Sequence, residues 1–260
     1  MRSKGAPRGP RMPRQASPRV LAIGGGIVAL AVIGIVLGLV LGGGSSSGIP
    51  KGTPTVGRVD ANSLPGAAAI RDLYKGIPQQ GFYLGKANAP VQMVMFIDLQ
   101  CPVCQDFEVK SLPTIVRKYV RTGNVRIHLR PWAFIGNDSY KGQDFAMAAA
   151  HQNKLFNFAG VLYDNQGPEN SGWMSDSILA EIAASVPGLN VPKLFADKSS
   201  SATKADVRQV DSEASKDNVQ GTPTILIGKT GQTPKDVTKP GIAPTLAEVE
   251  QAIDTALIKA

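Results

Sequence analysis

Residues 91–104 read VQMVMFIDLQCPVC, and this stretch decides the fold. The run from Val91 to Leu99 is almost continuously apolar and rich in β-formers, which is typical of a strand buried on both faces. From Pro102 the pattern becomes helical, with apolar residues on one broad face up to Tyr119. The stretch therefore predicts a strand that delivers a Cys-x-x-Cys pair to the edge of a sheet, at the N-terminus of a helix.

The surrounding pattern extends this stretch into an α/β domain. Val125 to Leu129 alternates like a second strand, stopped before Pro131, so the two strands flank the helix in a parallel βαβ unit. Pro113 is expected to kink the helix. The remaining expected elements are a helix at 67–74, a short edge strand at 81–85, helices at 140–162, 175–185, 191–197 and 202–218, a strand at 224–227, a polar turn region at 229–244, and a closing helix at 245–259 capped by Thr245 and Glu248.

The charge distribution argues against nucleic-acid binding. The 260 residues carry a formal net charge of +8. Six basic residues and no acid lie in residues 1–19, and without them 22 basic residues face 20 acidic ones. The basic character therefore belongs to an N-terminal tail and not to a binding face.

A 22-residue segment without charges, Val20 to Leu41, follows the basic tail. As a helix rising about 1.5 Å per residue it would reach roughly 33 Å, enough for the ~30 Å hydrocarbon core of a membrane. The positive residues before it predict a cytoplasmic N-terminus and an extracytoplasmic C-terminal domain. A cleaved signal peptide is the alternative, although its apolar region is usually shorter. Residues 42–66, rich in Gly, Ser and Pro, are expected to form a flexible linker to a domain at 67–260.

Cys101 and Cys104 are the only cysteines, and disulfide exchange is the chemistry they indicate most directly. A free thiol has a pKa near 8.5, which a helix N-terminus can lower to roughly 3.5–7.5. Half a zinc site would need two more ligands, and the only histidines, His128 and His151, lack ligand spacing. A structural disulfide across two residues closes a very small loop and removes little unfolded-state entropy. Two buried structural thiols do not suit an exported protein.

These residues together resemble the DsbA-type thioredoxin-fold oxidoreductases, in the membrane-tethered style of Gram-positive bacteria. The resemblance rests on the strand ending in FIDLQ before CPVC, and on the loop Val219-Gln220-Gly221-Thr222-Pro223-Thr224, which is similar to the family's cis-proline loop. Upstream, GIPQ at 76–79 and APV at 89–91 are similar too. The resemblance covers roughly residues 70–260 and implies a thioredoxin fold with an inserted helical domain at about 135–205.

The resemblance also implies roles for individual residues. Cys101 is expected to be the nucleophile and Cys104 the resolving partner, which together form a redox disulfide. Pro223 is expected to be cis and to face the cysteines, while the hydroxyl of Thr222 is a weaker candidate for adjusting thiol reactivity. Pro102 and Val103 complete the active-site motif.

The chain departs from the family pattern at two positions. Proteobacterial DsbA-type enzymes have His at the second intervening position, where this chain has Val103, so we expect a less oxidising pair. Many thioredoxin-like enzymes carry a buried carboxylate six residues before the first cysteine, and Met95 stands there instead. Asp98 is closer, but an acid at a strand end is more often solvated than catalytic.

The remaining aromatic and histidine residues are expected to be structural. His128 and His151 are expected to be packed or surface-exposed and not functional. The larger aromatic residues are expected in the core more than in a peptide groove beside Cys101; they are Trp132, Phe134, Phe156, Phe158 and Trp173.

The sequence thus predicts a membrane-anchored, extracytoplasmic thiol-disulfide oxidoreductase that introduces disulfides into exported proteins with reduced cysteines. It needs no metal and no bound organic cofactor. The resemblance implies a quinone-linked membrane partner of the DsbB or VKOR-like type that reoxidises Cys101 and Cys104. The alternatives are a reductase or isomerase of the same fold, a maturation factor for one client, and a non-catalytic folding or binding module with a structural disulfide.

Overall fold

The computed structural model describes residues 64–238 and 242–258. The predicted basic tail (1–19), membrane helix (20–41) and nearly all of the linker (42–66) lie outside these ranges. Among the described residues, no helix combines the length and the apolar character needed to cross a membrane.

The fold is α/β, with one mixed six-stranded sheet in the order β1-β2-β4-β3-β5-β6. Its strands are β1 (Gln79–Gln80), β2 (Tyr83–Leu84), β3 (Val91–Ile97), β4 (Val125–Pro131), β5 (Thr224–Lys229) and β6 (Lys235–Asp236). The central pair β3 and β4 is parallel, as predicted, while β5 runs antiparallel to β3. The first part of the chain forms α1 (Ala67–Tyr74), α2 (Pro102–Lys110), α3 (Leu112–Ile115) and the π-helical turn η1 (Val116–Val120).

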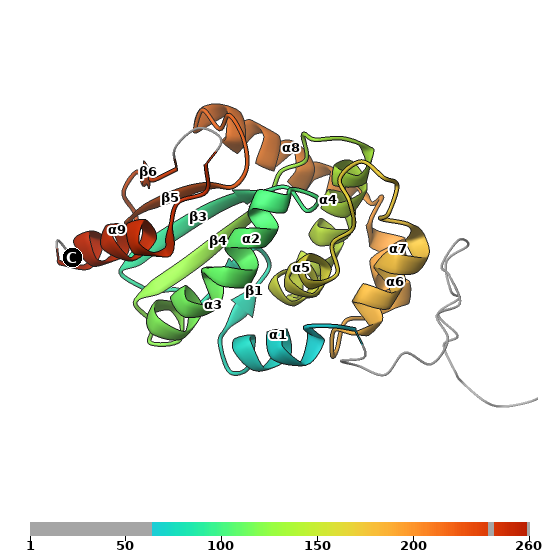
Figure 1. Cartoon of the computed structure of the whole chain (residues 1–260), viewed down its shortest axis with the longest axis horizontal. Helices are drawn as coiled ribbons and strands as arrows, with labels where there is room; N and C mark the ends of the chain where they lie inside the picture. The colour runs from blue at the N-terminus through green and yellow to red at the C-terminus, as the bar shows by residue number, and fades with distance from the viewer. Residues whose placement is uncertain (1–63, 239–241, 259–260) are drawn as a thin grey trace, which may run out of the picture. The chain divides into compact units, whose positions relative to one another are not determined.

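The helices cover both faces of the central strands (Figure 1). Between β4 and β5 the chain forms α4 (Asn137–Ala150), α5 (Leu155–Asp164), α6 (Asp176–Ala184), α7 (Val191–Asp197) and α8 (Ser201–Lys216), and it closes with α9 (Leu246–Ile258). Met93 and Met95 of β3 pack into the main hydrophobic cluster, which includes residues of α2, α3 and α9. Val94 and Phe96 face a second cluster with residues of α4 and α8. β3 is therefore buried on both faces, as its apolar run predicts.

Several predicted element limits need correction. The single helix expected over 140–162 is wrong, because α4 and α5 are separated by a turn at Asn153, whose φ of 56° lies in the left-handed region that Asn tolerates. The strand expected at the edge, β2, pairs with both β1 and β4. The polar region after 229 contains the short strand β6, which apolar alternation does not reveal.

Pro113 interrupts the predicted active-site helix as expected, whereas Pro131 does not end β4 as expected. α2 ends at Lys110 and α3 begins at Leu112, directly before Pro113, which lacks an N–H for the helical ladder. β4 continues through Pro131, beyond its predicted end at Leu129, and the next amide, of Trp132, donates to the Ile97 carbonyl at 2.7 Å. The predicted capping box also forms, since the Thr245 amide donates to Glu248 at 2.8 Å.

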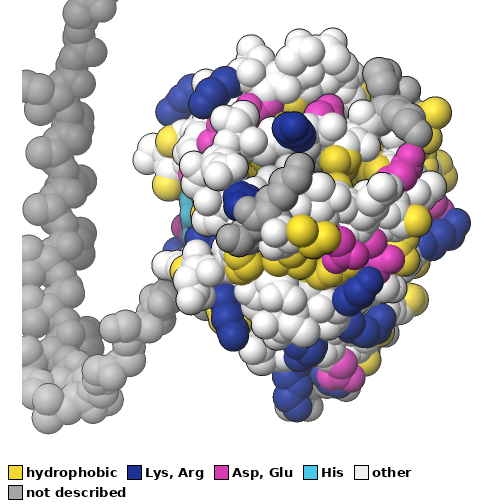
Figure 2. All heavy atoms as spheres, turned by 90° about the vertical axis from the view of Figure 1, so that its left-hand side faces the viewer, with side chains coloured by type: hydrophobic (Ala, Val, Ile, Leu, Met, Phe, Trp, Pro, Cys, Tyr) yellow, Lys and Arg dark blue, Asp and Glu magenta, His cyan; other side chains and the backbone are white. Residues whose placement is uncertain are grey.

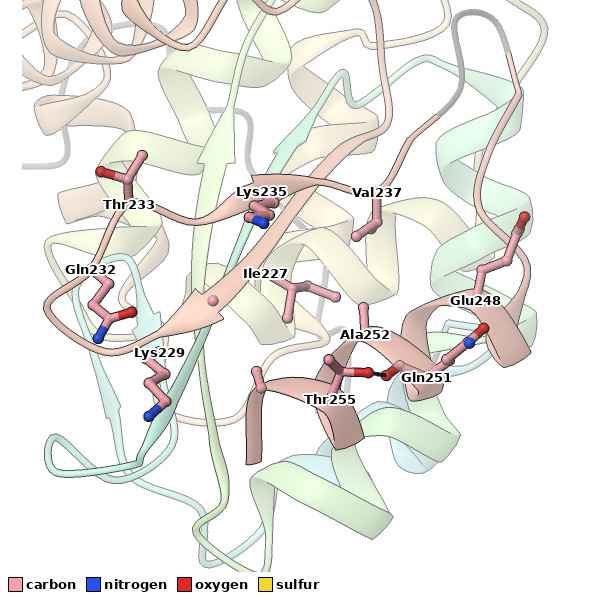
Figure 3. A pocket seen from close by; sticks show the side chains of 12 residues that line it. Ile227, Lys229, Gln232, Thr233, Lys235, Val237, Glu248, Gln251, Ala252 and Thr255 are labelled. Carbon is pink, nitrogen blue, oxygen red and sulfur yellow. Dashed lines mark hydrogen bonds between the residues drawn. The ribbon is translucent and has the colours of Figure 1, made fainter. Parts of the chain in front are cut away.

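A groove of about 610 Å³ lies between β5, β6 and α9. Ile227, Val237 and Ala252 point toward one another across it, with polar and charged side chains around them (Figure 3). On this side of the molecule, hydrophobic side chains form a band bordered by charged ones (Figure 2). The groove contains neither cysteine and is separate from the candidate active site.

Candidate active site

The cysteine pair lies where β3 passes into α2. Cys101 is the N-cap of α2, with extended backbone angles, and Pro102 occupies the first helical turn. The Cys101 amide donates to the Asp98 carbonyl at 3.0 Å, and the Cys101 carbonyl accepts from the Gln105 amide at 3.0 Å. Both cysteines are free thiols in this structure. The chain therefore presents the dithiol form of the predicted redox pair, at the carboxyl end of a central strand.

The loop before β5 faces this pair. The peptide bond between Thr222 and Pro223 is cis, as expected, and the Cys101 thiol lies 3.5 Å from the Thr222 carbonyl oxygen. The buried Thr222 hydroxyl lies beside the pair and acts to lower the pKa of both thiols, in keeping with the expected influence of Thr222 on thiol reactivity. Residues 101 and 222, far apart in sequence, thus meet because β3 and β5 are adjacent strands.

The two thiols occupy opposite electrostatic environments. Hydrogen bonds from the Cys104 thiol, the Cys104 backbone N–H, the Thr222 hydroxyl and the Val103 backbone N–H lower the pKa of Cys101 to about 6, in spite of its burial. Cys104 has no exposed surface, and its pKa is raised well above the usual value, chiefly by burial and then by its neighbour Cys101. Near neutral pH the site therefore favours a thiolate at Cys101 and a thiol at Cys104.

A hollow of about 390 Å³ opens between Val103 of the active-site motif and the cis-proline loop, and neither cysteine lines it. Apolar side chains that are unusually exposed line it: Val103 at 38 %, Phe134 at 44 % and Ile242 at 64 %. Phe134 also stacks on Trp132, with ring centroids 4.9 Å apart. Polar side chains, among them Asp236 and Thr238, complete the lining. An open hollow with exposed apolar side chains next to the active-site motif is suited to holding an extended peptide.

The core assignment of the aromatic residues holds for Phe156 and Phe158, which are buried, and Trp173 is partly buried. It is wrong for Phe134, because the segment after β4 carries that side chain out to the hollow. The two histidines make packing and pairing contacts away from the cysteines. His128 stacks on Tyr83 at 4.2 Å, and burial with nearby arginines lowers its pKa to about 3. His151 pairs with Asp206 at 2.6 Å.

Asp98 is buried, and not solvated as its position at a strand end suggests. Its carboxylate accepts hydrogen bonds from the backbone amides of Gln100, Phe134 and Ile135, at 3.0, 3.0 and 3.2 Å. These bonds satisfy the buried charge and fix the segment that carries Phe134. The carboxylate therefore anchors two loops beside Cys101.

Sequence reasoning missed two buried polar side chains near the pair. Gln100 has no exposed surface, donates to Ser139 Oγ at 2.7 Å and accepts from the Asn170 amide at 2.8 Å, so it ties the active-site turn to the helical region. Glu108, four residues after Cys104 in α2, is buried as well. Its spacing from Cys104 is the only signal in the sequence that it lies on the same helix face.

The described residues include no group of three or more His, Cys, Asp or Glu side chains arranged to hold a metal ion. A Cys-x-x-Cys pair at a helix N-terminus, opposite a cis-proline in this sheet, defines a thioredoxin-fold thiol-disulfide oxidoreductase.

Comparison with known proteins identifies the family. A family model described as "Thioredoxin" matches residues 78–253, well over half of the chain, so this chain belongs to the thioredoxin family. It is similar to the "Probable disulfide bond formation protein D" of Bacillus cereus, with 31% identity over 147 residues, 55% of this chain and 68% of the relative. The "Disulfide bond formation protein D" of Bacillus subtilis is 28% identical over 151 residues, covering 55% and 66% of the two chains.

Solved structures show the same fold at lower identity. Oxidised BdbD from Bacillus subtilis aligns with a TM-score of 0.61 and 22% identity, over 70% of this chain and 97% of that one. DsbA from Chlamydia trachomatis aligns with a TM-score of 0.56 and 21% identity, over 67% and 90%. The chain is a DsbA-type thiol-disulfide oxidoreductase.

Proposed function

We propose that this enzyme oxidises pairs of thiols in exported proteins, with Cys101 as the sulfur that the client attacks and Cys104 as its resolving partner. The observation that carries the proposal is the contrast between the two thiols: the pKa of Cys101 is lowered to about 6, and that of Cys104 is raised. A disulfide breaks most readily when the leaving sulfur is stable as a thiolate. The geometry favours Cys101 in that role when a client disulfide is released.

The proposed reaction begins with the oxidised pair. A client thiolate attacks Cys101 Sγ, the Cys101–Cys104 bond breaks, and Cys104 leaves with the electron pair and takes up a proton. A second client thiolate then attacks the client sulfur of the mixed disulfide, and Cys101 leaves as the thiolate. The client gains one disulfide and the enzyme becomes the dithiol.

The hollow beside Cys101 supports a client that binds in an extended form. Backbone groups next to Pro223 face the hollow, and Val103, Phe134 and Ile242 offer apolar contacts to side chains next to a client cysteine. Pro102 and Thr222 complete this surface as active-site support. Because these contacts are apolar and open, we expect a broad range of clients and not a single dedicated one.

The location of the enzyme belongs to the same proposal. Residues 20–41 would anchor the chain as a single membrane helix, residues 1–19 would remain cytoplasmic, and residues 42–66 would tether the catalytic domain, 67–260, outside. The apolar segment and the basic residues before it support this arrangement. Within that domain, the helical insertion would span about 135–205.

The reduced enzyme needs an oxidant after each cycle. We assign this step to a quinone-linked membrane oxidase of the DsbB or VKOR-like type, which would act on Cys101 close to the bilayer. The tether would keep the two proteins near one another and raise their effective concentration. No metal or organic cofactor of this chain takes part in the proposed cycle.

The test measures whether the oxidised protein forms a disulfide in a reduced peptide that contains two cysteines. The oxidised protein should convert a two-cysteine peptide to its disulfide, Cys101→Ala should lose this activity by at least about a thousandfold with an unchanged circular dichroism spectrum, and Cys104→Ser should accumulate clients bound to Cys101. Mass spectrometry of the trapped species names the clients. An active Cys101→Ala variant would contradict the assignment, and a pair that is mainly reduced in cells would favour a reductase or isomerase.

A further inference from the structure

Glu108 is a buried carboxyl group on the active-site helix, and the proposed reaction cycle assigns it no role. It lies four residues after Cys104 in α2, so both side chains project from the same helix face. Only 7 % of the residue is exposed, and its Oε1 atom has no hydrogen-bond partner. An unpartnered carboxyl group is costly to bury. Such groups concentrate at functional sites.

Helix α5 covers the part of α2 that carries Cys104 and Glu108. It packs against α2, and the Gln105 side chain donates to the Tyr163 carbonyl at 2.7 Å. The buried Tyr163 hydroxyl donates to the Asp98 carbonyl at 3.0 Å. Tyr163 lines the same cleft as Glu108, and its pKa is raised by burial and then by the charges of Cys104 and Glu108.

A cleft at the surface of the molecule reaches Glu108. It has a volume of about 270 Å³ and lies between α1, α2, η1 and α5. Glu108 lines it, together with the charged groups Asp164 of α5 and Arg117 of η1, and the buried Tyr74 of α1 packs nearby. Cys104 has no exposed surface and does not line the cleft. Water can therefore reach Glu108 but not the Cys104 sulfur.

We propose that Glu108 is the proton-exchange group of Cys104, one helical turn away, and that it passes this proton to and from the cleft. The inference rests on the proposed function, because it assigns the fate of the proton that the cycle puts on and takes off Cys104. Burial and the nearby charge of Asp164 raise the pKa of Glu108 to about 8, so both of its protonation states are populated slightly above neutral pH.

The two half-reactions use Glu108 in opposite states. When a client thiolate breaks the Cys101–Cys104 bond, the neutral carboxyl group gives its proton to the departing Cys104 thiolate. When the enzyme is reoxidised, the carboxylate takes the proton of the Cys104 thiol, and the resulting thiolate attacks Cys101 Sγ in the mixed disulfide. The Cys101–Cys104 bond forms, and the oxidant's sulfur leaves as a thiolate with the electron pair.

The lifetime of a mixed disulfide tests this step. Reduced enzyme is mixed with oxidised glutathione, samples are quenched with acid, and mass spectrometry follows the Cys101–glutathione adduct until Cys104 closes the ring. For the wild type the closure rate should rise through an inflection near pH 8. For Glu108→Gln, the adduct should survive about tenfold longer at pH 8.5, and the inflection should disappear. The rate at which Cys101 first attacks glutathione should stay unchanged.

Two further variants make the outcome decisive. Asp106→Asn removes an exposed acid of the same helix and should leave lifetime and inflection as in the wild type. Asp164→Asn removes a charge that raises the pKa of Glu108, so the inflection should move to lower pH. Glu108→Gln with an unchanged lifetime, or with a longer lifetime and the same inflection, overturns the inference. If Glu108→Gln does not fold, an unmoved inflection in Asp164→Asn overturns it.

Failure of the proposed function has a different signature. In that case the wild-type enzyme itself forms no adduct with glutathione and oxidises no dithiol peptide. A wild type that forms and closes the adduct, combined with a Glu108→Gln variant of identical pH dependence, refutes the role of Glu108 alone.

Discussion

The two cysteines are one helical turn apart, yet the two ends of that turn are built in opposite ways. The open end holds Cys101, which is 6 % exposed and is surrounded by backbone N–H groups of α2 and by the cis-proline loop; Val103 of the same turn lines the hollow. Cys104 lies at the closed end, without exposed surface, on the helix face that also carries the buried Glu108. One end stabilises a thiolate, and the other disfavours every charge that enters it.

This difference shows how a symmetric chemical pair acquires a direction. Two thiols in equal surroundings would share the roles of attacked and leaving sulfur. Here hydrogen bonds lower the pKa of one and desolvation raises the pKa of the other, so each step has a preferred sulfur. The same contrast requires a proton-exchange group for Cys104, because this buried sulfur must gain and lose a proton without contact with water.

The largest effect is expected at the closed end, when Glu108 is replaced by Gln and the free energy of unfolding is measured. Glu108 has a pKa of about 8 in the folded protein, against about 4.5 in the unfolded chain. Between these values the folded state keeps a proton that the unfolded state has lost, so stability falls as the pH rises through this window. Glu108→Gln should remove that fall and raise the free energy of unfolding at pH 9 by roughly 2–4 kcal/mol, with little effect at pH 4.5.

Urea denaturation of the reduced protein at several pH values measures this change. Asp106→Asn is the matched control, because Asp106 is exposed on the same helix. If Glu108→Gln and the wild type lose stability in parallel from pH 5 to pH 9, Glu108 is ionised in the folded protein at neutral pH and the closed end is not as described.

The open end should respond more modestly. Val103 is 38 % exposed next to Cys101 and carries no charge, so the thiolate depends on the Cys104 thiol and the helix N–H groups. Val103→His would add a cation in its protonated form, stabilise the thiolate and make the pair more oxidising by about 20–40 mV. Equilibration in glutathione buffers measures the potential, with Val103→Gln as a neutral control. A potential that does not rise would mean that residue 103 does not act on the Cys101 sulfur.

The open end could largely be predicted from the sequence, because local rules produce it. An apolar β-run, a Cys-x-x-Cys pair and a helix follow one another directly, and Thr222-Pro223 has a recognisable pattern. The strand order then brings Pro223 to Cys101 without further information. The cis bond and the buried central strand were therefore within reach of sequence reasoning.

The closed end could not be predicted in the same way, because distant segments create it. Glu108 in a helical sequence has the appearance of a solvent-facing residue, and it becomes buried only when α1 and α5 pack over α2. Asp98 is buried for the same reason, since the segment that donates the amides of residues 134 and 135 to its carboxylate is distant in the sequence. The turn between α4 and α5 depends on one left-handed Asn, for which apolar periodicity gives no sign.

A thiolate titration tests the contrast between the two ends most directly. Absorbance at 240 nm, measured on the reduced protein from pH 3 to pH 10, reports thiolate formation, and Cys104→Ala isolates the Cys101 contribution. We predict one thiolate that forms with a pKa of about 6 and no second thiolate below about pH 9; in Cys104→Ala, loss of the Cys104 hydrogen bond should raise the Cys101 pKa. Two thiolates that form together near pH 8.5, the value for a free thiol, would contradict this account.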